Sequence, residues 1–398
     1  MRSVDVAATF ESVVKPPRLD SVDLLRGLVM VIMALDHVRD YFTNVRFDPL
    51  DLTHTNAALY MTRWITHFCA PAFVFLAGTG AFLSTTRGKT KASLSRFLLT
   101  RGLWLVFLEL TWVRFGWLFN LDYSFMIGQV IWAIGWSMVA LSALVFLSAR
   151  TIAIFGIVMI AVHNAFDGID PGTLGVFGWP WQILHAGGAI QFLPGYTFGA
   201  FYPLIPWIGV MAAGYGFGSL LLREENARRR ILLRLGVVLT IAFVVIRASN
   251  LYGDPHPWTM QKNLLFTIFS FFNCEKYPPS LLYLMVTLGP AIASLAYFER
   301  VRGAVAKFFI VFGRVPMFYY LIHIPLIHAL ALLAAVLSGM DIGFMFANTP
   351  PWFWPGEYGF GLPVVYLVWA AVVISLYPLC RWFAELKSRR KDVWLSYF

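Results

Sequence analysis

The sequence predicts an all-α fold, a polytopic transmembrane helical bundle of about ten spans with both termini in the cytoplasm. The first observation is composition: 59% of the 398 residues are hydrophobic and 13% are charged, whereas a soluble domain carries about 25% charged residues. The second is that the apolar residues come in blocks long enough to cross a hydrocarbon core, which takes roughly 20 residues as a helix. The third is that Lys and Arg cluster between these blocks.

Each apolar block is interpreted as a helix because backbone groups in lipid must bond to one another. In chain order we expect spans at residues 23–42, 64–84, 97–118, 126–147, 151–166, 202–222, 231–249, 281–298, 313–338 and 362–382. These spans form one membrane domain, residues 23–382. It lies between a cytoplasmic N-terminal tail, residues 1–22, and a cytoplasmic C-terminal tail, residues 383–398.

The charge pattern supports this topology, because Lys and Arg favour cytoplasmic loops. The outside segments 167–201 and 339–361 contain neither residue. An odd number of spans would break the alternation. With the N-terminus inside, basic residues mark the N-terminal tail, 85–96, the Arg150 turn, 223–230, 299–307 and the C-terminal tail.

The net charge of +10 does not indicate a nucleic-acid partner, because these basic residues mark topology and contact anionic lipid. We therefore expect membrane lipid as a partner.

Three distant cysteines, Cys69, Cys274 and Cys380, give no disulfide framework and no metal-ligand spacing. The first 22 residues lack an apolar signal region, so we expect the first span to be an uncleaved signal-anchor.

The first span carries a stripe of ionisable residues, which are costly in lipid and by default face a cavity or the bundle interior. Arg26 and His37 are eleven residues apart, so they point the same way about 16 Å apart along a helix, and we expect both to line a single aqueous groove. Asp23 lies one turn before Arg26 and Asp40 one turn after His37. Asp36 is rotated off the stripe.

This order of residues suggests chemistry across the membrane. A permanent cation near the cytoplasmic end, Arg26 with Asp23 beside it, suits a phosphate-bearing ligand. A histidine further out exchanges a proton near neutral pH, as a general base must. His37, helped by Asp36, is the candidate. The alternative is a structural ion-pair network in which Asp23 neutralises Arg26.

Other spans contribute further candidates. His323 lies in the ninth span with Tyr319 one turn away, and His67 opens the second span. Glu109 in the third span is a second-rank candidate for orienting a catalytic histidine. His328 is rotated about 140° from His323 and no carboxylate is near in sequence, so we expect no metal. The sequence contains no His-Glu-x-x-His motif, glycine-rich phosphate loop or G-x-S-x-G elbow.

Two sets of loops allow two interpretations each. The outside segments 167–201 and 339–361 are rich in aromatic residues, which either anchor the membrane interface or form a carbohydrate-facing vestibule. The inside segments 87–96 and 223–230 are basic, and either mark topology or hold an acidic nucleotide.

Three motifs resemble known membrane acyltransferases. Arg26, ten residues and His37 resemble the Arg-x10-His signature of integral-membrane enzymes that O-acetylate envelope polysaccharides. The strings "RLDSVDLLRGLVMVIMALDH" and "APAFVFLAGTGAFLS" more closely resemble the heparan-α-glucosaminide N-acetyltransferase family and its bacterial relatives. "FGRVPMFYYLIHIPLIH" resembles the C-terminal span of that family and contains His323.

The resemblance implies a multi-pass acyltransferase of the bacterial inner membrane that moves an acetyl or short acyl group from cytoplasmic acetyl-CoA to a glycan or amino-sugar acceptor outside. His37 is closer to the O-acetyltransferase pattern, which leaves an ester or an amide product open. A homodimer is also left open. The competing hypotheses are a secondary transporter, a glycan-lipid flippase, or a non-catalytic scaffold of the same fold.

Overall fold

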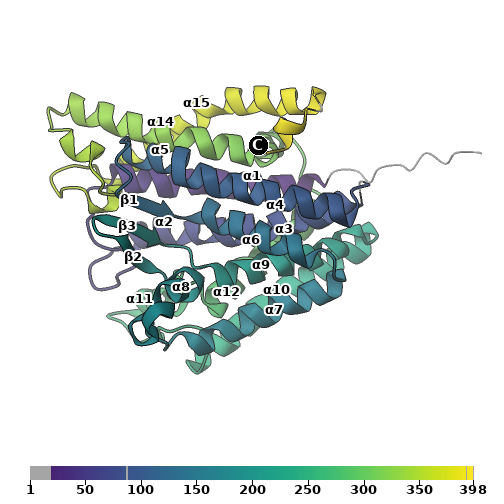
Figure 1. Cartoon of the computed structure of the whole chain (residues 1–398). Coiled ribbons are helices and arrows are strands. Elements are labelled where there is room, and N and C mark those ends of the chain that lie inside the picture. The colour runs from purple at the N-terminus through teal and green to yellow at the C-terminus, as the bar shows by residue number, and fades with distance from the viewer. Residues whose placement is uncertain (1–18, 87, 391, 398) are drawn as a thin grey trace, which may run out of the picture.

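The computed structural model describes residues 19–86, 88–390 and 392–397. Lys15, Arg18, Arg87 and Lys391, which enter the topology argument, lie outside these residues. The described chain is mostly helical (Figure 1). Its longer helices are α1 (Asp20–Phe42), α3 (Cys69–Thr85), α4 (Lys91–Leu108), α6 (Val130–Leu144), α7 (Ala149–Val162), α9 (Leu204–Phe217), α10 (Glu225–Ser249), α12 (Leu281–Phe298), α13 (Ala304–Arg314), α14 (Pro316–Leu337) and α15 (Leu362–Arg389).

Seven helical stretches of the described chain are long and apolar enough to cross a membrane. They confirm a multi-pass membrane protein; the count of ten spans and the side of each terminus stay predictions. They are Ala57–Thr85, Ala149–Phe166, Leu204–Leu222, Glu225–Ser249, Leu281–Phe298, Pro316–Leu337 and Leu362–Arg389.

The three other expected spans are also helical, but each has a feature of its own. Ionisable residues interrupt the apolar sequence of α1. The next, α4, continues through a π-helical turn, η2 (Glu109–Val113), into the short helix α5 (Arg114–Leu118). The third, α6, has only 15 residues.

A small sheet corrects the all-α expectation. Strands β1 (Phe125–Gly128), β2 (Gly188–Leu193) and β3 (Tyr196–Ala200) pair in the order β1-β3-β2, with β1 parallel and β2 antiparallel to β3. The predicted span 126–147 included three of the four residues of β1, because strand residues as apolar as these cannot be distinguished from a helix by hydropathy alone.

Two predicted spans differ from the bounds of the helices that contain them. The ninth span was expected from residue 313, but the helix is interrupted at Val315. Helix α14 begins at Pro316, because proline fits the first helical position. The last span was expected to end at 382, but α15 continues to Arg389. Amphipathic helix ends lie in the interface, where apolar content no longer marks a boundary.

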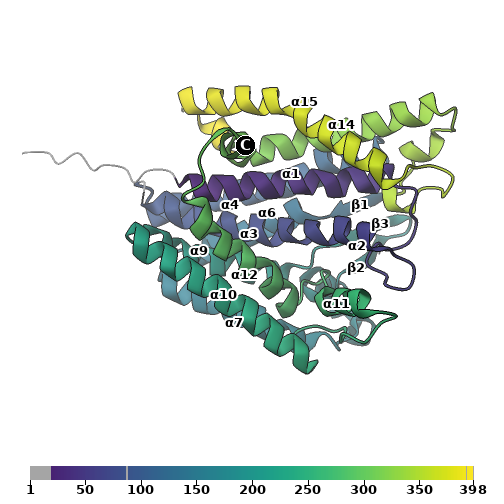
Figure 2. The same cartoon turned by 180° about the vertical axis from the view of Figure 1, so that it is seen from behind.

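The bundle is arranged around α1. Figures 1 and 2 show α14 and α15 on one side, α7 and α10 on the opposite side, and α1 between them. Helix α1 packs against α13, α15, α14, α12 and α3. Most of its residues are buried, so its ionisable side chains are shielded from lipid.

The closest helix crossing is that of α1 with α13. A Cβ added at Gly27 would lie 1.8 Å from the carbonyl oxygen of Phe309, and one added at Gly313 would lie 1.8 Å from that of Asp23. Only glycine leaves room for two backbones this close, as is common between helices in membranes. This contact fixes the start of α1, and therefore Arg26, against α13.

We expect Gly27→Ala and Gly313→Ala each to destabilise the protein by about 1–3 kcal/mol, because a methyl group must push two backbones apart. Thermal unfolding in detergent would measure the change. Gly80→Ala in α3 is the matched control, since nothing lies within 4 Å of its added Cβ. Equal melting temperatures for all three variants would contradict the packing argument.

Candidate active site

Helix α1 carries Arg26 and His37 on one continuous helix, about 16 Å apart along its axis. The two residues line different cavities rather than the single groove that their spacing suggests. The cavity at Arg26, here called the arginine pocket, has a volume of about 300 Å³. The cavity at His37, here called the histidine pocket, has a volume of about 480 Å³. Val130, at the start of α6, lines both.

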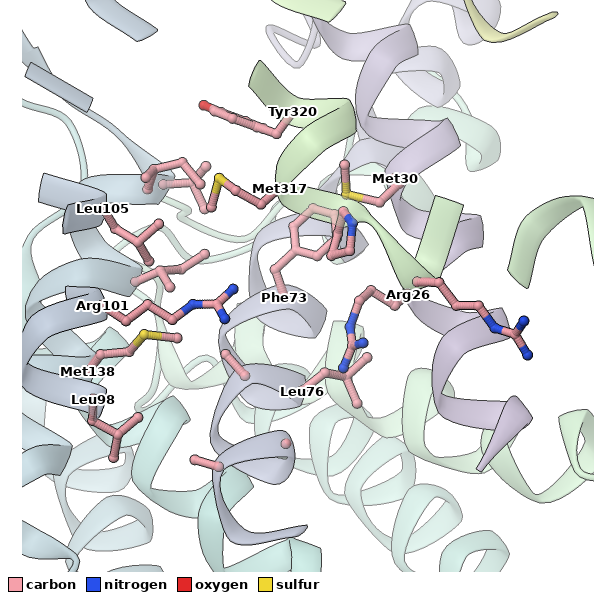
Figure 3. A pocket seen from close by; sticks show the side chains of 18 of the residues that line it. Arg26, Met30, Phe73, Leu76, Leu98, Arg101, Leu105, Met138, Met317 and Tyr320 are labelled. Atoms are coloured by element: carbon pink, nitrogen blue, oxygen red, sulfur yellow. The ribbon is translucent and has the colours of Figure 1, made fainter. Parts of the chain in front are cut away.

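Four cationic side chains line the arginine pocket, one each from α1, α4, α13 and α15. They are Arg26, Arg101, Arg314 and Lys387. The remaining wall is mostly apolar and includes four methionines. Figure 3 shows Tyr320 at one end of the cavity, followed by Met30 and Met317 and then by Arg26 and Arg101. The pocket therefore combines an anion-binding region with an apolar channel.

Asp23 orients Arg26, as the spacing predicts. The Nη1 of Arg26 donates to Asp23 Oδ1 and to the carbonyl oxygen of Gly313, each at 3.3 Å. The side chain of Asp23 is 4% exposed and that of Arg26 is 20% exposed. Asp23 thus holds the guanidinium group at the pocket, while the acid itself stays buried.

A hydrogen-bonded histidine pair joins α1 to α14 in the centre of the bundle. The Nδ1 of His37 and the Nε2 of His323 are 2.7 Å apart, and the rings are stacked 18° from parallel. His323 is completely buried and His37 is 9% exposed. His37 lines the histidine pocket, whereas His323 lines neither cavity. His323 is therefore a positioning residue, and His37 is the one that can meet a ligand.

The surroundings of His323 determine where the protons lie. Its Nδ1 faces the carbonyl oxygens of Tyr319 and Tyr320, at 2.9 and 2.8 Å. Carbonyl oxygens only accept, so Nδ1 carries the proton, and in the neutral ring Nε2 is the acceptor. His37 must then donate through Nδ1, which leaves a lone pair on its Nε2. This assignment gives His37 the tautomer of a general base.

The carboxylates near His37 are held by arginines. Asp36 accepts two hydrogen bonds from Nη1 of Arg63, at 2.7 and 2.9 Å, and lies 3.0 Å from Nη2 of Arg39. Asp40 pairs with the same Arg39 nitrogen at 2.5 Å. All four line the histidine pocket. Asp36 therefore shares the cavity with His37, but the hydrogen bond of His37 Nδ1 goes to His323.

Aromatic side chains complete the histidine pocket. Phe201 ends the 167–201 segment and Tyr202 follows it, and Trp352 and Phe353 come from the 339–361 segment. These parts of the two aromatic loops therefore face a cavity. Others, such as Trp179, are exposed, as expected of interfacial anchors.

Tyr277 and Lys276 bring another loop to this pocket. Burial would raise the pKa of the Tyr277 hydroxyl, but the positive charges of Lys276 and Arg63 outweigh burial and lower that pKa. The mouth of the pocket is thus rich in positive charge.

Two neighbouring tyrosines on α14 differ in position. Tyr320 lines the arginine pocket, and its ring centre lies 6.2 Å from that of His37. Its buried hydroxyl has no hydrogen-bond partner among the described residues. Tyr319 stacks on His323 with ring centres 5.0 Å apart and lines neither pocket. Tyr320 therefore has a free donor at the site, while Tyr319 supports the histidine.

His67 and Glu109 lie outside both cavities. His67 is 2% exposed and packs edge-on against Tyr283. Glu109, at the π turn, accepts a hydrogen bond from the backbone N–H of Gln129 at 3.0 Å and so holds the first turn of α6. Gln129 and Val130 line the histidine pocket, so Glu109 acts on the site through the backbone and does not contact His37.

Sequence reasoning missed Tyr320, Arg63, Lys276 and the cations of α4, α13 and α15. Arg101 and Lys387 were treated as topology charges or not singled out, because their position over one pocket depends on helix packing. An unpartnered buried hydroxyl such as that of Tyr320 has no sequence signal. The adjacent "FYY" in the α14 segment gives no reason to prefer one tyrosine.

The comparison with protein families gives one match: the heparan-alpha-glucosaminide N-acetyltransferase catalytic family, over residues 18–248. This range is more than half of the chain, and the chain belongs to this family. The family indicates a transferase of the membrane acetyltransferase type. The matched range includes Arg26 and His37 and ends before α14, which carries Tyr320 and His323. No curated protein matches the chain.

We expect nuclear magnetic resonance of ¹⁵N-histidine-labelled protein at neutral pH to show His37 protonated at Nδ1 and not at Nε2. The assignment would come from the signals lost in His37→Gln. In His323→Ala the acceptor is gone, so the His37 signals should move towards a mixture of tautomers. A proton on Nε2 of His37 in the unmodified protein would contradict the hydrogen-bond chain.

Proposed function

We propose that this family member moves an acetyl or other short acyl group from cytoplasmic acyl-CoA to a sugar hydroxyl or amine on the outer side of the bacterial inner membrane. One observation carries the proposal. A buried histidine pair stands between a cation-lined pocket and a pocket lined by carboxylates, arginines and aromatic rings. These are the features that a phosphate-bearing donor on one side and a polar, ring-shaped acceptor on the other would need.

The donor fits the arginine pocket by charge and shape. Arg26, Arg101, Arg314 and Lys387 would bind the phosphates of CoA, since guanidinium groups suit phosphate geometry. The apolar channel past Met30 and Met317 would hold the flexible arm. The thioester would then reach Tyr320, at the far end of the cavity.

The acceptor would enter the histidine pocket from outside. Aromatic faces such as Trp352 and Phe353 pack against the C–H surfaces of sugars. The carboxylates of Asp36 and Asp40, fixed by Arg39 and Arg63, are placed to accept hydrogen bonds from sugar hydroxyls or an amine. The acceptor would thus lie with one nucleophilic group near His37.

Transfer would be direct in this arrangement. The acceptor oxygen or nitrogen attacks the thioester carbonyl carbon while Nε2 of His37 takes its proton. The Tyr320 hydroxyl donates a hydrogen bond to the carbonyl oxygen as negative charge develops there. The carbon–sulfur bond breaks, the new ester or amide forms, and CoA leaves as a thiolate that takes the proton from His37. His323 holds the His37 tautomer throughout.

We expect His37→Gln to lower kcat by about 10²–10⁴-fold, the usual loss of a general base. CoA should still raise the melting temperature of this variant, because the arginine pocket is unchanged. Acyl transfer from radiolabelled acetyl-CoA to envelope glycans would measure the rate. Stabilisation by a free solute but not by CoA would instead support a transporter.

The relay alternative, in which His37 is acylated first, is separable in the same assay. Rapid mixing with donor alone would give a burst of acyl-enzyme that is lost in His37→Gln.

Arg101→Gln should raise the KM for acyl-CoA by about tenfold or more, because one charge-assisted bond is lost. Arg302→Gln removes an exposed charge outside the pocket and serves as its control.

We expect Tyr320→Phe to lower kcat by about 10²-fold with little change in KM, because the hydroxyl would act only on the developing oxyanion. Tyr319→Phe is the matched control. It removes a buried hydroxyl from the adjacent residue and keeps the ring that stacks on His323. Equal rates for the two variants would remove Tyr320 from the mechanism.

A further inference from the structure

A second cluster of titratable side chains lies outside both pockets, at the far end of α7. His163 opens the 3₁₀ turn η3 (His163–Phe166) that continues α7, and Asp167 follows that turn. His185 lies 18 residues later in the π-helical turn η5 (Gln182–Ala186). Both histidines are 2% exposed and the Asp167 side chain is 18% exposed. Neither pocket includes these residues, and the proposed transfer does not use them.

The ligand atoms of the three side chains are close enough to share one ion. The Nδ1 of His163 lies 3.4 Å from the Nε2 of His185, and Asp167 Oδ1 lies 3.6 Å from the same Nε2. All three ligand atoms lie within 4.8 Å of one another. Two ligands bound tetrahedrally to Zn²⁺ at about 2.0–2.1 Å are about 3.4 Å apart. The distances of 3.4 and 3.6 Å from Nε2 of His185 therefore need to change little for all three atoms to bind one Zn²⁺.

The surrounding residues orient these side chains. The amide of Asn164 donates to Asp167 Oδ2 at 2.8 Å. This leaves Oδ1 directed at His185, buried and without a hydrogen-bond partner among the described residues. Trp181 stacks on the His185 ring, with ring centres 4.8 Å apart and planes 12° from parallel. Such supporting contacts are typical of metal ligands, whose orientation they fix.

A proton competes for the same position. The Nε2 of His185 lies 2.9 Å from the carbonyl oxygen of His163, so a protonated Nε2 donates a hydrogen bond there. Metal ions bind the deprotonated nitrogen and release the proton. The Nε2 of His185 can therefore either donate a hydrogen bond to the His163 carbonyl oxygen or bind a metal ion. Only the metal ion would also give Oδ1 of Asp167 a partner.

We propose that His163, Asp167 and His185 bind one divalent transition-metal ion, with Zn²⁺ the ion that two imidazoles and one carboxylate suit best. The ion would tie η3 to η5 and so close the loop between them. The turn η5 leads directly into β2 and β3, and the residues after β3, Phe201 and Tyr202, line the histidine pocket. The metal would therefore be structural, and the proposal does not depend on acyl transfer.

The test uses the full chain, purified without a histidine tag and treated with EDTA. Titration calorimetry with zinc sulfate should give saturable binding of one ion per chain and a raised melting temperature. Co²⁺ in place of Zn²⁺ should give the visible absorption of a low-symmetry site. His185→Gln should abolish these signals.

Asp167→Asn keeps the side-chain shape and should weaken Zn²⁺ binding at least tenfold even if His185→Gln fails to fold. The control is His54→Gln. His54 pairs with Asp51 at 2.7 Å, and both side chains are exposed. The substitution therefore removes another histidine–carboxylate pair, one to which the described residues add no third metal ligand. It should leave Zn²⁺ binding unchanged. No stoichiometric Zn²⁺ binding by the unmodified chain, or equal binding by Asp167→Asn, would overturn the proposal.

Discussion

The cost of placing charge in lipid governs this structure. Helix α1 carries ionisable residues near both of its ends, and an exposed position against hydrocarbon would cost several kcal/mol for each of them. The bundle meets this constraint by surrounding α1 with five other helices. The two glycines at the α1–α13 crossing bring the first turns of α1 into backbone contact with the last turns of α13. The position of every other site residue follows from this central helix.

Burial of α1 also divides its polar residues into two groups. Near its start, Arg26 joins cations from three other helices around an otherwise apolar cavity. Near its end, Asp36 and Asp40 are balanced by Arg39 and Arg63. The two groups line separate pockets, and Val130 at the start of α6 lines both of them. His37, hydrogen-bonded to His323, lines the histidine pocket and would be the proton acceptor there in the proposed function.

The end of the molecule that carries the small sheet is built differently from the helical bundle. Three short strands, two aromatic loops and the His163–Asp167–His185 cluster lie between the helices there. Irregular backbone of this kind is tolerated where water or protein satisfies its polar groups. The loops can therefore vary in shape while the helices hold His37 and Tyr320 in place. The proposed function assigns acceptor choice to this end and donor binding to the other.

The sequence by itself determined the membrane class, the positions of most helices and the pairing of Arg26 with Asp23, because hydropathy and helical spacing are local properties. It also singled out His37, from helical spacing and a resemblance, and His323, from a resemblance, as candidates. Only the tertiary structure showed that these two histidines are hydrogen-bonded to each other and that Tyr320 rather than Tyr319 lines the arginine pocket. It alone placed Glu109 on the α6 backbone and brought His163, Asp167 and His185 together. Contacts between residues far apart in sequence depend on how helices cross, and hydropathy carries no record of that geometry.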